Sequence, residues 1–145
     1  MDPLAFPYNT WRKLLKNAFN EYDDQLLHRT PPQGDPALRS AISEYLYKAR
    51  GVHCTKDQVV IGAGTNHLLL VLGFILGNSF SVALENPVYS QAYQIFSRMG
   101  HPVLHVDIDA AGIQVAPLQG REHTAVYVTP SHQFPLGISM PISRR

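Results

Sequence analysis

The sequence that decides the fold is VVIGAGT at residues 59–65, followed directly by NHLLLVLGFIL at residues 66–76. Residues 59–61 are short, β-branched and followed by glycine, a pattern that predicts a buried strand. The run at 66–76 is about three helical turns long and apolar nearly all round, and Gly77 follows it, so we expect a helix that is covered on both sides. A strand that runs through a glycine turn into a helix is the opening unit of an α/β sheet.

Strand and helix patterns continue to alternate downstream of this unit. Because strands joined by helices pair in parallel with right-handed crossovers, the order predicts an α/β fold with an open, mostly parallel sheet and flanking helices. Residues 107–123 contain a turn at Asp109 to Gly112 and show no further helical or strand periodicity. The expected elements are strands at 81–84, 103–106 and 125–129 and a helix at 90–99.

The sequence upstream of residue 59 predicts an N-terminal arm and helices. Residues 1–10 contain two prolines and no periodicity, which favours an extended arm. Residues 11–58 form a helical N-terminal segment, and residues 59–145 begin the α/β large domain. The first helix carries apolar residues at helical spacing, with Asn9 or Thr10 available as its N-cap. These apolar residues are Trp11, Leu14, Leu15, Ala18, Phe19 and Tyr22.

A second helix of this segment has clear start and stop signals. A polar loop at 28–34 contains two adjacent prolines, which fix two φ angles and remove two donors. Asp35 is the expected N-cap and Pro36 the first helical residue, while Gly51 ends the helix.

Composition limits the function classes. The 145 residues carry a formal net charge of +1, which leaves no electrostatic footprint for nucleic acid, so we expect no direct DNA contact from this segment. Only 16% of residues are charged, against about 25% in typical domains, so we expect part of the surface to lie against a second copy in a homo-oligomer or against a further domain absent from this sequence. The longest apolar run is about half of a bilayer span, and no signal peptide is recognisable, so we expect a cytoplasmic chain with no membrane contact. Cys54 is the single cysteine and excludes an internal disulfide.

The glycine turn at 62–65 is the sharpest local feature. Backbone N–H groups at a helix start, with glycine allowing close approach, form a cradle for phosphate, and the Thr65 hydroxyl adds a donor. The alternative is an ordinary tight turn in which the glycines serve packing alone. The pattern is neither a Walker A motif nor the dinucleotide fingerprint.

Two further stretches follow strands, at the edge where open α/β sheets bind ligands. The first is ENPVYS at 85–90, whose Tyr89 can lie on a planar cofactor or simply be a rim aromatic. The second is the rigid loop TPSHQFPLG at 129–137. The seven histidines lack metal-ligand spacing, so we expect no metal site, and no nucleophile motif is present.

These features, preceded by GDPALRSAI at 34–42, resemble fold-type I pyridoxal-phosphate proteins of the aminotransferase class I and II group. Within that group, AFP at 5–7 with Trp11, and above all YVTPSHQFPLG at 127–137, are similar to the MocR (GabR-like) subfamily of GntR-type transcription regulators. The resemblance spans nearly all of residues 1–145. It implies a partial fold-type I aminotransferase-like large domain.

The resemblance also assigns roles in binding pyridoxal 5′-phosphate. It implies that Ala63, Gly64 and Thr65 bind the cofactor phosphate and that the Tyr89 ring stacks on the pyridine. Phe134 stands where aminotransferases carry an asparagine that bonds the cofactor's phenolic oxygen. Because phenylalanine cannot donate, the resemblance leaves this contact to His132 or Gln133.

The departures from the family suggest that residues 1–145 are an incomplete domain. No winged helix-turn-helix precedes the arm, and the family's Schiff-base lysine falls beyond residue 145. All four lysines, Lys13, Lys16, Lys48 and Lys56, precede the glycine turn, so we expect no catalytic residue here. We therefore interpret the chain as a fragment of the effector domain of a MocR-type regulator, whose parent takes a small amine or amino-acid effector. The alternatives are the corresponding fragment of an aminotransferase and a cofactor-free α/β interaction module.

Overall fold

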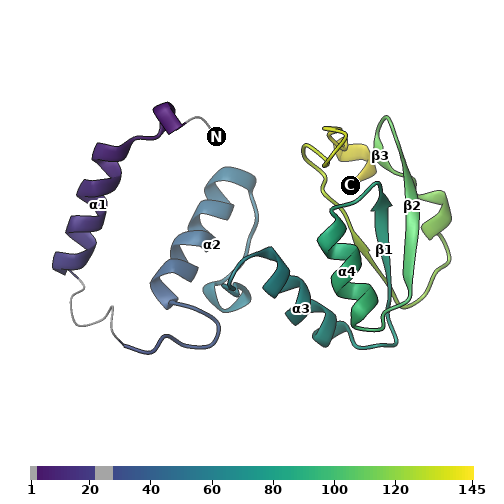
Figure 1. Cartoon of the computed structure of the whole chain (residues 1–145), viewed down its shortest axis with the longest axis horizontal. Helices are drawn as coiled ribbons and strands as arrows, with labels where there is room; N and C mark the ends of the chain where they lie inside the picture. The colour runs from purple at the N-terminus through teal and green to yellow at the C-terminus, as the bar shows by residue number, and fades with distance from the viewer. Residues whose placement is uncertain (1–2, 22–27) are drawn as a thin grey trace. The chain divides into compact units, whose positions relative to one another are not determined.

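The structure, a computed structural model, describes residues 3–21 and 28–145 (Figure 1). The chain divides into two compact units, Met1–Val60 and Ile61–Arg145, and each is described by itself. Tyr22, expected on the first helix, lies outside the described residues.

The first unit is helical. It contains the 3₁₀ turn η1 (Pro3–Ala5), the helices α1 (Tyr8–Glu21) and α2 (Pro36–Arg50), and the 3₁₀ turn η3 (Lys56–Gln58). The expectation of an extended arm over residues 1–10 is wrong, and so is that of an N-cap at Asn9 or Thr10. The Pro7 carbonyl accepts the Trp11 N–H at 3.0 Å, so the helix begins directly after Pro7. Proline suits this place because the N–H that it lacks has no helical partner there.

The predicted boundaries of α2 are confirmed. The Asp35 carboxylate accepts the Leu38 N–H at 2.8 Å, and Pro36 occupies the first helical position. Gly51 ends the helix in the left-handed region at φ +66°, where its N–H reaches the Leu46 and Tyr47 carbonyls. These caps satisfy backbone groups that a helix end leaves open.

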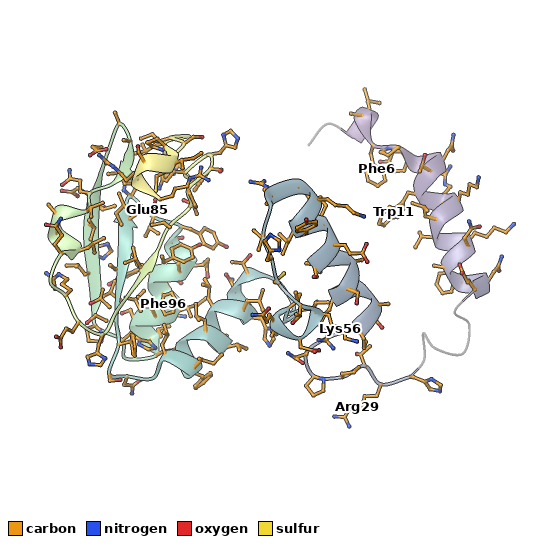
Figure 2. All side chains as sticks on the ribbon, turned by 180° about the vertical axis from the view of Figure 1, so that it is seen from behind. Phe6, Trp11, Arg29, Lys56, Glu85 and Phe96 are labelled. Atoms are coloured by element: carbon orange, nitrogen blue, oxygen red, sulfur yellow. The ribbon has the colours of Figure 1, made fainter. Side chains whose placement is uncertain are left out.

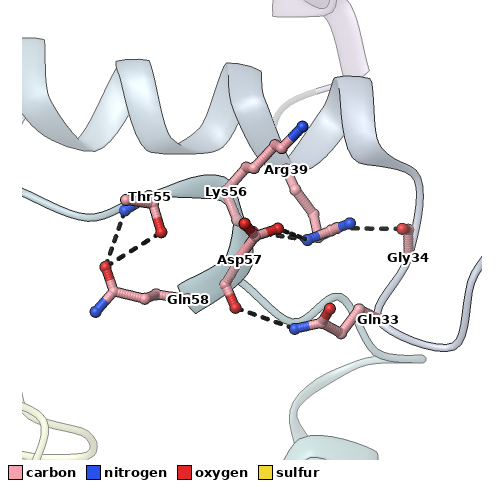
Figure 3. A network of polar contacts seen from close by, with 7 residues as sticks. All are labelled: Gln33, Gly34, Arg39, Thr55, Lys56, Asp57 and Gln58. Carbon is pink, nitrogen blue, oxygen red and sulfur yellow. Dashed lines mark hydrogen bonds and ion pairs between the residues drawn. The ribbon is translucent and has the colours of Figure 1, made fainter.

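Buried Arg39 joins α2 to the chain on either side of it (Figure 3). Its Nε donates to the Gly34 carbonyl at 3.2 Å, and its Nη1 donates to the Lys56 carbonyl at 2.8 Å and to the Asp57 carboxylate at 3.5 Å. One guanidinium therefore fastens the loop before α2 to η3.

The second unit is the α/β sheet domain, and the predicted fold class is confirmed. Its sheet has the order β3-β2-β1-β4, in which β1 runs parallel to both β2 and β4. A turn at Asp109 folds β3 back antiparallel on β2, a short hairpin that the sequence analysis missed. The elements are α3 (Thr65–Leu76), β1 (Ser81–Asn86), α4 (Ser90–Arg98), β2 (Val103–Asp109), β3 (Gly112–Ile113), η4 (Ala116–Leu118), β4 (Thr124–Tyr127) and η5 (Ile142–Arg144).

Helices α3 and α4 pack on one face of the sheet, where Leu69 and Phe96 meet Leu84 (Figure 1). The expectation that the apolar helix α3 is covered all round is wrong. Phe74 and Ile75 are 79% and 75% exposed, because sheet and α4 together cover only the stripe around Leu69.

The expected strand at Val59–Ile61 is also absent. Val60 is 48% exposed, and no strand among the described residues pairs with this segment. A strand exists only where a neighbour supplies ladder hydrogen bonds, so β-branched composition alone does not form one.

Candidate phosphate and cofactor site

The topology points to the carboxyl edge of the sheet between β1 and β4. The chain passes from β1 through α4 to β2 on one side, whereas β4 pairs with β1 on the other, with Leu84 opposite Tyr127. Loops that leave neighbouring strands on opposite sides form the crevice in which open α/β sheets bind ligands. The loops after β1 and β4 are those that carry Tyr89 and residues 129–137.

A buried carboxylate connects these two loops. Glu85 is 1% exposed, and its Oε2 accepts the Thr129 N–H at 3.1 Å and the Thr129 hydroxyl at 2.8 Å. Its other oxygen, Oε1, is buried and has no hydrogen-bond partner among residues 3–21 and 28–145. Glu85 lies at the end of the sheet that holds the loops (Figure 2). Glu85 is not among the predicted site residues, although a carboxylate directly after the apolar positions of a buried strand is a usable signal for a structural role.

Gln133 fixes the same two loops to each other. Its side chain is buried, its Nε2 donates to the Pro87 carbonyl at 2.8 Å, and its Oε1 accepts the Leu136 N–H at 3.2 Å. His132 is exposed at φ +55°, and its N–H donates to the Ser139 hydroxyl at 3.4 Å. Of the two residues considered for the cofactor's phenolic oxygen, Gln133 thus forms hydrogen bonds within the chain, while His132 is exposed.

Two tyrosines belong to the same strand ends and loops as Glu85. Tyr89 directly precedes α4 and is 37% exposed, so its ring is accessible. Burial raises the pKa of the Tyr127 hydroxyl, and the nearby charges of Glu85 and Tyr89 raise it further. Tyr127 at the end of β4 therefore shares an environment with both residues.

The glycine turn leads into α3 as predicted, with Thr65 as its first residue. Gly64 adopts φ +89°, and a Cβ added there would meet nothing within 4 Å, so the space above it is open. The Gly64 N–H donates to the Gly62 carbonyl at 2.8 Å, and the Ala63 N–H donates to His67 Nδ1 at 3.3 Å. The Ala63 and Gly64 N–H groups thus have partners within the chain, and Thr65, the last residue of the expected cradle, begins the first helical turn, whose N–H groups have no helical acceptor.

No group of three potential metal ligands occurs in the part of the chain that the structure describes. None of the helices in that part has the length and apolarity that a membrane span requires.

The family of aminotransferases class I and II matches residues 5–141. The chain belongs to this family. The chain is similar to the uncharacterized HTH-type transcriptional regulator YdeL of Bacillus subtilis. The two are 39% identical over all 145 residues of the chain, which correspond to 31% of the length of YdeL. The probable rhizopine catabolism regulatory protein MocR of Rhizobium meliloti is 31% identical over 97% of the chain and 29% of its own length. The resemblance to MocR-type regulators is thereby confirmed.

A solved aminotransferase shares the fold. Kynurenine aminotransferase of Pyrococcus horikoshii, whose structure contains the cofactor form PMP, has a TM-score of 0.86 at 27% identity, over 99% of this chain and 38% of that one. The chain thus spans about a third of the length of the relatives it matches.

The residues present fit the phosphate and ring of such a cofactor. The start of α3 has the Thr65 hydroxyl and first-turn N–H groups without a helical acceptor, next to a Gly64 whose Cβ position is clear of other atoms, which suits an anion. The accessible Tyr89 ring suits a planar aromatic group. This aminotransferase-family chain thus carries backbone donors at the start of α3 and an accessible aromatic ring after β1.

Proposed function

We propose that this chain forms the phosphate-binding and ring-stacking part of a pyridoxal 5′-phosphate site in the aminotransferase-like effector domain of a MocR-type regulator. The observation that carries the proposal is the start of α3, where Gly64 at φ +89° has no atom within 4 Å of its Cβ position and no side chain caps the first-turn N–H groups. Its family membership and its similarity to the regulators YdeL and MocR support the same assignment.

Each residue of the proposed site has a distinct task. Thr65 supplies its N–H and hydroxyl to the phosphate, and Gly64 admits the anion to the turn. Tyr89 covers one face of the ring. Glu85 and Gln133 hold the loops in place, and His132 provides a polar side chain beside them. Pyridoxal phosphate supplies an aldehyde that captures primary amines, which fits a small amine or amino-acid effector.

The proposal is for a binding function, not for catalysis by this chain. All four lysines lie in residues 1–60, before the phosphate turn, and Phe134 at 67% exposure offers no donor. The proposal includes a homo-oligomeric, cytoplasmic parent regulator and no direct DNA contact from these residues, whose net charge is only +1.

The test is an absorbance titration of the chain with pyridoxal phosphate and, separately, with pyridoxal. We expect saturable binding of pyridoxal phosphate at concentrations at which pyridoxal does not bind, because phosphate is the group for which donors are present. Equal binding of both compounds contradicts a phosphate site. Binding of neither supports a cofactor-free interaction module instead.

A further inference from the structure

The imidazole of His67 lies directly against the glycine turn. Its Nδ1 accepts the Ala63 N–H at 3.3 Å. A Cβ added to Gly62 would lie 2.6 Å from that nitrogen and 2.7 Å from Leu68 Cδ2, closer than real side chains approach. The ring can therefore reach the Ala63 N–H because residue 62 is glycine.

This contact determines which donors the turn presents. With the Ala63 N–H on His67 and the Gly64 N–H on the Gly62 carbonyl, neither group points to the open space above Gly64. The Gly64 carbonyl accepts the Leu68 N–H at 3.2 Å and so begins the hydrogen bonding of α3. The donors left for an anion are those of the first helical turn.

We propose that His67 is a positioning residue of the phosphate site, acting through Nδ1 as the acceptor that fixes the Ala63 N–H. This inference rests on the proposed function of the turn. His67 does not contact the phosphate; it holds residues 62–64 in the conformation that directs the start of α3 at the anion. The essential property is an acceptor atom at the δ position of residue 67, bonded to Cγ, and not a charge.

Three substitutions separate acceptor position from ring size. His67→Ala removes the acceptor, His67→Asn places an amide oxygen where Nδ1 stands, and His67→Gln carries its oxygen one bond further out. Since one neutral hydrogen bond is at stake, we expect His67→Ala to weaken binding of pyridoxal phosphate roughly two- to tenfold. His67→Asn restores the affinity and His67→Gln does not. His28→Ala, in the exposed loop 28–34, is the matched control and leaves binding unchanged.

The measurements are titrations with pyridoxal phosphate and inorganic phosphate, together with amide hydrogen exchange at Ala63. Faster exchange in His67→Ala that His67→Asn reverses, with a parallel loss and recovery of affinity, supports the positioning role. Unchanged affinity in His67→Ala, or equal losses in the alanine and asparagine variants, overturns it. If the unsubstituted chain binds neither compound, the proposed function fails, and Ala63 exchange alone decides whether His67 holds the turn: equal rates in the unsubstituted chain and His67→Ala overturn that contact.

Discussion

Glu85 and Thr129 stand 44 residues apart in the sequence, yet a single carboxylate oxygen of Glu85 accepts both the N–H and the hydroxyl of Thr129. The contact joins the end of β1 to the residue that opens the loop 129–137. Burial of the Glu85 carboxylate costs free energy of desolvation, and within the described part of the chain Thr129 supplies the hydrogen bonds that offset it, since the second oxygen has no partner there.

Loss of the Thr129 hydroxyl should therefore destabilise the second unit. We expect Thr129→Val to lower the free energy of unfolding by about 1.5–3 kcal/mol, the usual range for a hydrogen bond to a charged group. Urea denaturation followed by circular dichroism measures the change. Thr124→Val is the control, because the Thr124 hydroxyl bonds only to the exposed Glu122 carbonyl. Equal losses for the two substitutions would show that a hydrogen bond to the Glu85 carboxylate stabilises the fold no more than one to an exposed carbonyl.

The hydrogen bonds of the Arg39 guanidinium should stabilise the first unit against unfolding to a similar extent. Arg39→Met keeps the aliphatic stem but leaves the Gly34 and Lys56 carbonyls without their donor. We expect a loss of about 2–4 kcal/mol in the free energy of unfolding. Arg29→Met, in the exposed loop, should change it by less than about 0.5 kcal/mol. Thermal melts of both variants test this, and a small effect at Arg39 would contradict the role of its network.

The contact between Asp109 and Arg144 predicts that the second unit loses stability at acidic pH. The hydrogen bond from Arg144, followed by that from the Ala111 N–H, holds the pKa of the Asp109 carboxyl below its ordinary value of 3.8. A lowered pKa in the folded state stabilises the fold above the unfolded-state pKa, and that contribution disappears as the pH falls through the folded-state pKa. Stability measured from pH 6 downward should thus decline below about pH 4.

Arg144→Gln should remove part of this decline, because the Asp109 pKa then rises toward its value in the unfolded chain. Arg121→Gln is the matched control, since the Arg121 side chain donates to the Pro117 carbonyl and not to a carboxylate. Parallel acid profiles for the unsubstituted chain and Arg144→Gln would be inconsistent with the assignment.

The sequence predicted what local chemistry decides. The caps of α2 at Asp35 and Gly51, and the helix that begins after Gly64, depend on residues within one turn of each other, and the structure has them as expected. The strand expected at Val59–Ile61 failed because a strand needs a distant partner. The exposure of Phe74 likewise depends on how much of α3 other elements cover.

The sequence likewise predicted only those parts of the candidate site that depend on local chemistry. Tyr89 was recognisable from its place after a strand, and the glycine turn from its place before a helix, whereas the role of Glu85 depends on its contact with the distant Thr129. The internal bonds of Gln133 to Pro87 and Leu136 were equally invisible, because a sequence does not show which loops meet.

The lysines provide a test of whether this chain forms a selective covalent bond with pyridoxal phosphate. We expect no lysine to be labelled selectively when the chain is incubated with equimolar pyridoxal phosphate and reduced with borohydride, because Lys13, Lys16, Lys48 and Lys56 all precede the turn. Peptide mass spectrometry should show scattered, substoichiometric labelling. One lysine modified near completion, and no longer modified in Tyr89→Ala, would show that the chain completes its own cofactor site.

Gly64 offers the most direct test of the phosphate turn. It adopts φ +89° and ψ 172°, a region open essentially to glycine alone, so Gly64→Val is strained even though its Cβ would meet no atom. Valine would both shift the turn and occupy the space through which an anion approaches. We expect affinity for pyridoxal phosphate to fall roughly tenfold or more, while any affinity for pyridoxal stays the same.

Strain alone must be separated from loss of the site, and Gly100 provides the comparison. It has a similar φ of +85° just beyond α4, and a Cβ there would also meet nothing within 4 Å. Gly64→Val and Gly100→Val should each lower the free energy of unfolding by about 1–3 kcal/mol. Only Gly64→Val should lose pyridoxal phosphate, measured by titration well below both melting temperatures. If Gly100→Val loses the cofactor equally, the effect of Gly64→Val reflects general destabilisation, and the start of α3 is not the phosphate site.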